Sequence, residues 1–229
     1  MTGERPHCLV IGVGPGTGLA CVRRFVGAGY TVSMIARHEG RLASWAEEII
    51  DTVAYQSDIT DLDGFRATLE RIKAEQGVPN VIVYNASLAT FAPYSELDPA
   101  DFERNFRANT TGLLVTAQVF APDMIEGDGG ALIITGNTSA RRGTPRFVGF
   151  APTKASQRIL GESLARELGP QGVHVAYVMI DALIDMPWVR KQMPDDPAER
   201  FAQPDDIAGE GFHIAHQPQS TWSYMHEIR

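Results

Sequence analysis

The chain has 229 residues, a length that α/β proteins often reach as one unit, so we predict a single domain over residues 1–229. Hydrophobic residues make up 44% and charged residues 21% of the chain, which excludes a disordered chain, a coiled coil and a collagen-like repeat. The net charge of −8 argues against a nucleic-acid or anionic-membrane partner, because either one requires a broad positive field.

The cysteines and the hydropathy pattern bear on the cellular location. Cys8 and Cys21 are the two cysteines, and their apolar neighbours predict buried free thiols. No run of 18 apolar residues occurs, and the apolar stretch 8–22 contains four glycines and a proline without a basic leader. We therefore expect a cytoplasmic protein without a membrane span.

Along the first half of the chain, apolar runs alternate with amphipathic stretches. Strands are predicted at 7–13, 30–36, 53–55 and 80–84, and helices at 16–29, 39–50 and 60–77. The third helix opens with Thr60, and Asp63 three residues later completes a pattern like a capping box.

The same alternation continues to the end of the chain. Helices are predicted at 98–124, 147–168 and 207–216, and strands at 131–135, 173–180 and 222–228. Residues from about 183 to 205 are rich in Pro, Asp and Met and are interpreted as a mobile substrate loop. Strands separated by helices form parallel βαβ units. The predicted fold class is therefore α/β, with a doubly wound, Rossmann-type parallel sheet in a three-layer sandwich.

A glycine-rich loop separates the first predicted strand from the first helix. It contains Gly12, Gly14, Gly16, Thr17 and Gly18. Glycines permit a tight turn and let backbone N–H groups approach a pyrophosphate at the helix N-terminus. Because Thr17 occupies the position of the third glycine in G-x-G-x-x-G, the spacing fits G-x-x-x-G-x-G better. The loop predicts a dinucleotide-binding site.

From residue 10 to residue 222 the sequence resembles the short-chain dehydrogenase/reductase family. The glycine spacing carries this resemblance, although Ile11 stands where the family usually has threonine. Further matches follow in chain order on the expected elements: Asp58 and Ile59, then Asn85, Ala86 and Ser87, then Asn109 with Gly112, and finally Lys154.

The resemblance implies an oxidoreductase with a nicotinamide cofactor. It places Asp58 and Ile59 beside the adenine, Lys154 at the nicotinamide ribose and Ile184 near the nicotinamide amide. It also implies a homodimer or homotetramer. An NAD enzyme usually ends its second strand with a carboxylate, but here Arg37 stands there and could pair with a 2′-phosphate. NADPH is therefore predicted over NADH, unless Arg37 merely caps the strand or Glu39 is the missing acid.

The catalytic positions depart from the family pattern. Phe150 replaces the tyrosine four residues before Lys154, and Asn137 replaces the serine thirteen residues before that tyrosine. Asn109 and Lys154 remain. A general acid/base contributes about 10²–10⁴-fold, so its loss weakens ketone reduction without abolishing hydride transfer. We expect Phe150 to form an apolar wall of the pocket.

Several proton routes remain open. Water could relay the proton through Asn109 and Lys154, or the substrate could be an iminium ion or a conjugated acceptor that needs no tyrosine. Asn137 could donate to a substrate oxygen or serve as a turn amide. Further candidates for proton donation or polarisation are Thr138, Ser139, Tyr94 and Asp181.

A basic cluster follows the fifth predicted strand and consists of Arg141, Arg142, Arg146 and Arg158. It suggests an anionic small-molecule substrate, although a solvated charged loop explains it equally well. His213 and His216 have no third ligand nearby in the sequence, so no metal is expected.

The sequence thus predicts an NADP(H)-dependent oxidoreductase with an altered catalytic centre, acting on a small carbonyl, imine or conjugated substrate. The alternatives are a non-enzymatic NADP(H)-binding protein and an enzyme that uses the same fold for non-redox chemistry.

Overall fold

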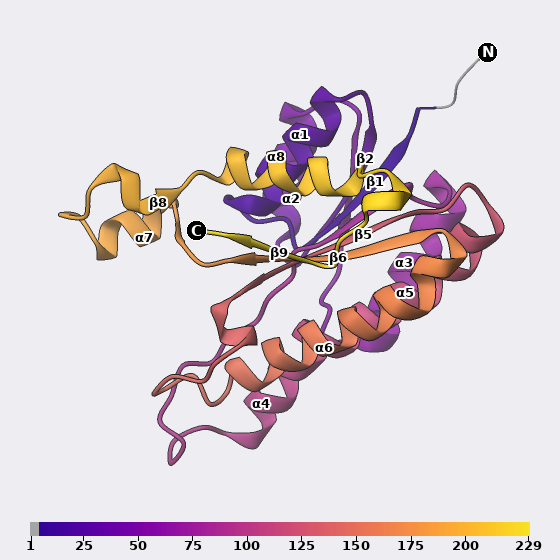
Figure 1. Cartoon of the computed structure of the whole chain (residues 1–229). Helices are drawn as coiled ribbons and strands as arrows, with labels where there is room; N and C mark the ends of the chain where they lie inside the picture. The colour runs from indigo at the N-terminus through magenta and orange to yellow at the C-terminus, as the bar shows by residue number, and fades with distance from the viewer. Residues whose placement is uncertain (1–4) are drawn as a thin grey trace.

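The computed structural model describes residues 5–229, which form a seven-stranded parallel sheet with helices on both faces (Figure 1). The strands are β1 His7–Ile11, β2 Thr31–Ala36, β3 Thr52–Gln56, β4 Val81–Tyr84, β5 Gly130–Asn137, β6 Val173–Ile180 and β9 Met225–Ile228. Their order is β3-β2-β1-β4-β5-β6-β9, and each neighbouring pair is parallel. The doubly wound fold is therefore confirmed.

Two layers of helices cover the sheet (Figure 1). One layer contains α1 Thr17–Gly27, α2 Glu39–Glu48 and α8 Pro204–Ala215. The other contains α3 Leu62–Gln76, α4 Pro99–Phe106, α5 Gly112–Glu126 and α6 Ala151–Leu168. Successive strand side chains enter opposite cores, so Leu9 packs with the α3–α5 side and Val10 with the α1–α8 side. Both faces are buried, which explains the nearly continuous apolar runs of the strands.

The two cysteines lie in the core on the α1–α8 side. Cys8 and Cys21 are free thiols and both are buried, as predicted. Burial raises the pKa of the Cys8 thiol far above its ordinary value and that of Cys21 to about 12. Both therefore stay protonated and pack as small apolar side chains.

Helix starts differ from the predicted ones. Asp61 caps α3 by accepting a hydrogen bond from the Gly64 backbone at 3.2 Å, whereas the Thr60 hydroxyl donates to Asp58. The predicted helix 60–77 therefore begins two residues later. Helix α6 begins at Ala151 rather than 147, because Pro152 lacks an N–H and fits only in a first turn.

The long predicted helix 98–124 is divided into three parts. A π-helical turn, Arg107–Thr111, separates α4 from α5. Such turns insert a residue into the helical ladder and occur often at functional sites. Here the turn contains Asn109, one of the predicted catalytic residues.

The segment 183–205 has secondary structure of its own. The strand β7 Leu183–Ile184 pairs in parallel with β8 Phe201–Ala202, and α7 Pro187–Gln192 lies between them (Figure 1). Asp185 accepts two hydrogen bonds from Arg190, at 2.7 and 2.9 Å, and these bonds lower the pKa of its carboxyl to about 2. The mobility of this segment stays a prediction. No helix within residues 5–229 is long and apolar enough to cross a bilayer.

Candidate functional site

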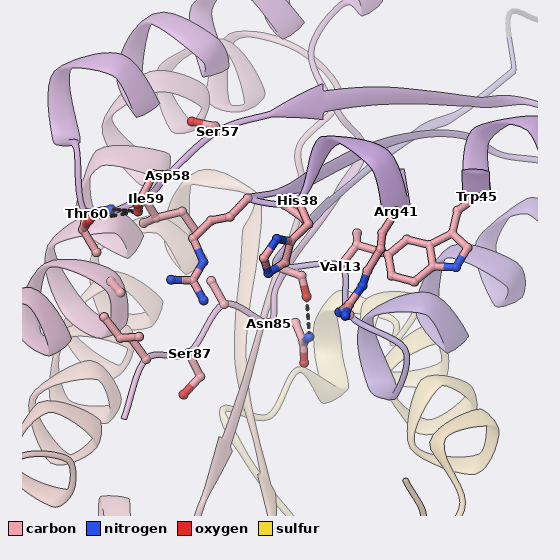
Figure 2. A pocket seen from close by; sticks show the side chains of 17 residues that line it. Val13, His38, Arg41, Trp45, Ser57, Asp58, Ile59, Thr60, Asn85 and Ser87 are labelled. Atoms are coloured by element: carbon pink, nitrogen blue, oxygen red, sulfur yellow. Dashed lines mark hydrogen bonds between the residues drawn. The ribbon is translucent and has the colours of Figure 1, made fainter. Parts of the chain in front are cut away.

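A cavity of about 340 Å³ opens at the carboxyl ends of β1, β2, β3 and β4 (Figure 2). Doubly wound sheets bind ligands at this edge, where the strand order reverses. Its lining includes Gly12, Gly14, Arg37, Asp58, Ile59, Asn85, Ala86 and Ser87, all predicted to bind the cofactor. Outside the lining lie Gly16, Thr17, Gly18, Lys154 and Ile184.

The glycine loop is held by contacts from two neighbouring strands. Gly12 has φ +90°, and a Cβ there would lie 2.5 Å from the Ala86 Cα. The Asn85 side chain donates to the Gly12 carbonyl at 2.8 Å and accepts from the Thr135 hydroxyl at 2.9 Å. Gly14, by contrast, has nothing within 4 Å of its Cβ position, so the loop leaves open space beside it.

The start of α1 has an unsatisfied polar group. The Thr17 hydroxyl is buried and has no hydrogen-bond partner within residues 5–229. A donor at a helix N-terminus suits a phosphate oxygen, so the loop fits a dinucleotide. Met186, just after β7, lies against the loop: its sulfur would be 2.5 Å from a Cβ at Gly16. A phosphate that reaches Gly16 must therefore contact or displace Met186.

One end of the cavity is cationic and aromatic. Figure 2 shows Arg41 and Trp45 at this end and His38 between them and Asp58, and Arg37 also lines the cavity. Sequence reasoning found Arg37 but missed the other three. The signal for Arg41 was its spacing four residues after Arg37, which carries it onto the first turns of α2. Glu39, the alternative acid, does not line the cavity.

Asp58 lies at the other end of the cavity (Figure 2). Its carboxylate accepts hydrogen bonds from the Thr60 backbone and hydroxyl, both at 2.9 Å. Burial raises the pKa of Asp58, but these bonds and the charges of Arg37 and Arg104 outweigh it and lower the pKa overall. Asp58 is therefore ionised at neutral pH and holds the turn after β3.

Lys154 is buried and directed into the protein. It is 2% exposed, and its Nζ donates to the Thr135 carbonyl at 3.2 Å and to the Gln157 side-chain oxygen. Burial lowers the pKa of Lys154 to about 7, and no carboxylate of residues 5–229 pairs with it. Gln157 is fully buried and was missed from the sequence, where nothing marks it out beyond its place one turn after the lysine.

Replacing the buried lysine should change how stability depends on pH. The unfolded chain keeps the Lys154 proton up to pH about 10.5, whereas the folded chain loses it near pH 7. The Lys154 contribution to the free energy of unfolding therefore rises above pH 7, by roughly 1 kcal/mol per pH unit.

This prediction is measured with urea unfolding at pH 7.0, 7.8 and 8.5 for the wild type and Lys154→Met. Subtracting the free energy of unfolding of the variant from that of the wild type removes the contribution of the other titrating groups. This difference should increase as the pH rises. A difference that stays constant across the three pH values contradicts a depressed lysine pKa.

Asn109 holds two segments together. Its side chain accepts from the Leu88 backbone N–H at 2.9 Å and donates to the Leu88 carbonyl and the Thr153 hydroxyl, both at 2.8 Å. The side-chain oxygen and nitrogen thus both have protein partners. In this arrangement Asn109 fastens the loop after β4 to α6, and its side chain makes no direct hydrogen bond to Lys154.

Asn137 and Thr138 lie where β5 ends. The Asn137 oxygen accepts from the Ser139 backbone at 3.1 Å, as a turn amide does. Its amide nitrogen donates no hydrogen bond within residues 5–229, which leaves that donor available to a ligand. Thr138 begins the short 3-10 turn that follows.

Phe150 belongs to an aromatic cluster. It is 4% exposed, and its ring meets that of Phe91 edge-on at 5.6 Å and lies 6.4 Å from that of Phe147. The Phe150 ring is thus largely covered, whereas Phe91 is 51% exposed. That Phe150 forms a wall of the substrate pocket stays a prediction. Tyr94 is 85% exposed, so no packing holds it as a proton donor.

The basic residues after β5 divide into paired and unpaired ones. Arg141 contacts Glu227 at 2.6 Å and Arg158 contacts Glu162 at 3.6 Å. No ion pair to Arg142 or Arg146 is formed within the described chain. Likewise, residues 5–229 contain no group of three or more His, Cys, Asp or Glu side chains placed to hold a metal ion.

Comparison with known proteins shows the family. Residues 6–189 match the family described as short chain dehydrogenase, so the chain belongs to the short-chain dehydrogenase/reductases. Its Rossmann-type parallel sheet matches that of solved members of this family.

Two curated relatives and one solved structure cover most of the chain. Oxidoreductase asL5 of Sarocladium schorii is 25% identical over 93% of this chain and 89% of its own length. Carbonyl reductase (NADPH) 2 of Sus scrofa is 28% identical over 88% of this chain and 85% of its own. A short-chain dehydrogenase from Rhodopseudomonas palustris superimposes with a TM-score of 0.84 at 27% identity, covering 99% of both chains.

Proposed function

We propose that the protein is an NADP(H)-dependent oxidoreductase with an altered catalytic centre, acting on a small carbonyl, imine or conjugated substrate. The observation that carries this proposal is the cavity in which the glycine loop meets Arg37, His38 and Arg41. The relative named carbonyl reductase (NADPH) 2 supports the same cofactor and reaction type.

The cavity suggests how each end of the cofactor would be held. The open space at Gly14 and the unsatisfied Thr17 hydroxyl suit the phosphates, and Arg37, His38 and Arg41 suit a 2′-phosphate. Asp58 and Ile59 would lie at the adenine. When bound, the nicotinamide supplies or accepts a hydride.

The chain's own residues would orient the substrate without an acidic phenol. The amide nitrogen of Asn137 would donate to a substrate oxygen, as an oxyanion donor does, while the amide oxygen keeps its bond to the Ser139 backbone. Lys154 would have to exchange Gln157 for a ribose hydroxyl. Protons would reach the product from water, since Phe150 has none to give.

A second candidate is a protein that binds NADP(H) without catalysis. Phe150 is buried among aromatic rings and Lys154 is directed at Gln157, an arrangement with no ionisable group presented to a substrate. The two candidates share the cofactor and differ only in turnover.

Thermal-shift titration with NADPH, NADP⁺, NADH and NAD⁺ tests the cofactor. A ligand at 100 times its Kd stabilises the folded state by about 2.7 kcal/mol. We expect shifts with the phosphorylated pair. If none of the four dinucleotides shifts the melting temperature, the proposal is wrong.

Removing one cation should reduce the preference for NADPH over NADH. Arg41→Gln should weaken NADPH binding by roughly tenfold or more and leave NADH binding unchanged, because a charge-assisted bond to the 2′-phosphate contributes about 1.5–3 kcal/mol. Isothermal titration calorimetry measures both constants. Arg71→Gln, on the exposed surface of α3, is the matched control. Equal losses for the two cofactors contradict a 2′-phosphate contact.

The remaining partners are also proposals. We propose a homodimer or homotetramer, supported by the exposed apolar side chains of Phe106, Leu114 and Ile159 along α4, α5 and α6. Light scattering of the purified protein measures the assembly. A cytoplasmic location and a mobile substrate loop at 183–205 complete the proposal.

A further inference from the structure

A second cavity lies beside the start of α6. It has a volume of about 400 Å³, which is within the range of small-molecule sites. It is formed by the turn Thr138–Ala140, the loop 141–150 and the first turns of α6. It adjoins the candidate catalytic segment, because it contains Ser139, two residues after Asn137, and Ala151, directly after Phe150.

The lining of this cavity combines an apolar wall with a cationic rim. The apolar wall consists of Pro145, Phe147, Val148, Ala151, Pro152 and Ala155, and the polar rim of Arg141, Arg142, Ser139 and Thr144. No Asp or Glu is among the lining residues. The chain has a net charge of −8, so this cavity is a locally positive region on an acidic protein.

The two arginines of the rim differ in their surroundings. Glu227 holds Arg141 at 2.6 Å, so its charge is already compensated. Arg142 pairs with no carboxylate of the described chain. A guanidinium presents parallel N–H donors that match a carboxylate in a bidentate pair. One uncompensated guanidinium therefore suits a ligand with a single negative charge.

The wall of the cavity is held in place by the opposite loop. The Ala92 backbone donates to the Arg146 carbonyl at 3.0 Å, and the Phe91 and Phe147 rings lie 4.8 Å apart. Arg146 adopts φ +68°, a conformation that non-glycine residues rarely hold unless their surroundings enforce it. The Phe147 part of the wall is thus held in place without a ligand, which reduces the entropy lost when a ligand binds.

We propose that this cavity binds the substrate as an organic carboxylate with an apolar body, the carboxylate on Arg142 and the body against Phe147 and Val148. That this ligand is the substrate rests on the proposed oxidoreductase function. The binding of a carboxylate in this cavity does not depend on the cofactor. We predict that a neutral analogue binds more weakly, because a neutral ligand cannot pair with the exposed guanidinium of Arg142.

Calorimetric titration of the full chain with 4-phenylbutyrate tests the proposal. The comparison ligands are 4-phenylbutyramide, which lacks the charge, and acetate, which lacks the apolar body. Inorganic phosphate at equal ionic strength serves as a plain anion. We expect 4-phenylbutyrate to bind at least about tenfold more tightly than each of the three. Arg142→Gln should weaken the binding of 4-phenylbutyrate by roughly tenfold, because it removes one charge-assisted pair. Arg166→Gln removes an exposed arginine outside the cavity and should leave the binding of 4-phenylbutyrate unchanged.

The outcomes separate this proposal from the cofactor proposal. Four results would each overturn the carboxylate site. The first is no saturable binding of 4-phenylbutyrate, and the next two are an amide or a phosphate that binds as tightly as 4-phenylbutyrate does. The fourth such result is an Arg142→Gln protein that binds 4-phenylbutyrate as tightly as the wild type. The NADPH thermal shift is recorded for the same variants and should not change. If 4-phenylbutyrate binds and NADPH does not, the site stands and the proposed function fails.

Discussion

Phe150→Tyr should raise the NADPH-dependent reduction of a simple ketone by about 10²–10⁴-fold, the usual contribution of a positioned general acid. Phe150 is the N-cap residue of α6 and lies four residues before Lys154, and both side chains are buried. A hydroxyl at this position would supply the proton that the present side chain lacks. Lys154, whose pKa burial lowers to about 7, would lower the pKa of the new phenol if its ammonium turned from Gln157 toward residue 150.

The measurement is kcat/KM over a panel of ketones, with NADPH at saturation. Phe147→Tyr is the matched control, because it adds the same hydroxyl to a neighbouring ring of the aromatic cluster. The control should show no gain. If Phe150→Tyr binds NADPH normally and still gains nothing, simple carbonyl reduction is ruled out and the non-catalytic candidate is favoured.

Gly12→Ala should destabilise the protein by about 2 kcal/mol or more and abolish dinucleotide binding. A side chain at φ +90° is strained, typically by 1–2 kcal/mol, roughly the left-handed penalty. The new Cβ would also meet the Ala86 backbone at 2.5 Å, and backbone cannot rotate away. The loop, β1 and β4 would have to separate, and the Asn85 contact to the Gly12 carbonyl would be lost.

Gly14→Ala is the matched control in the same loop. Nothing lies within 4 Å of its Cβ position and its φ is not positive, so stability should change by less than about 0.5 kcal/mol. Urea unfolding gives both free energies, and the thermal shift with NADPH gives binding. A Gly12→Ala protein as stable as Gly14→Ala would show that β1 and β4 are not in close contact at the loop.

The alternation of strands and helices could be predicted because it depends on local periodicity. Burial on both faces makes each strand a continuous apolar run, and one-sided burial gives each helix its stripe, so the order of elements is visible in the sequence. The helix ends were less certain, since Asp61 and Thr60 are both good caps and only packing selects one. The glycine loop could be predicted because the tight turn requires glycines at these positions, and their spacing is visible in the sequence.

The contacts within the site depended on tertiary structure. Met186 reaches Gly16 from 170 residues away, and Asn109 joins Leu88, in the loop after β4, to Thr153 in α6. That Lys154 faces Gln157 rather than solvent depends on how deeply α6 packs against β5. The sequence by itself therefore determined the order of elements, the glycine turn and the absence of an ionisable group at Phe150. Only the folded chain decided which polar groups are paired, because pairing depends on distances between segments that no local pattern encodes.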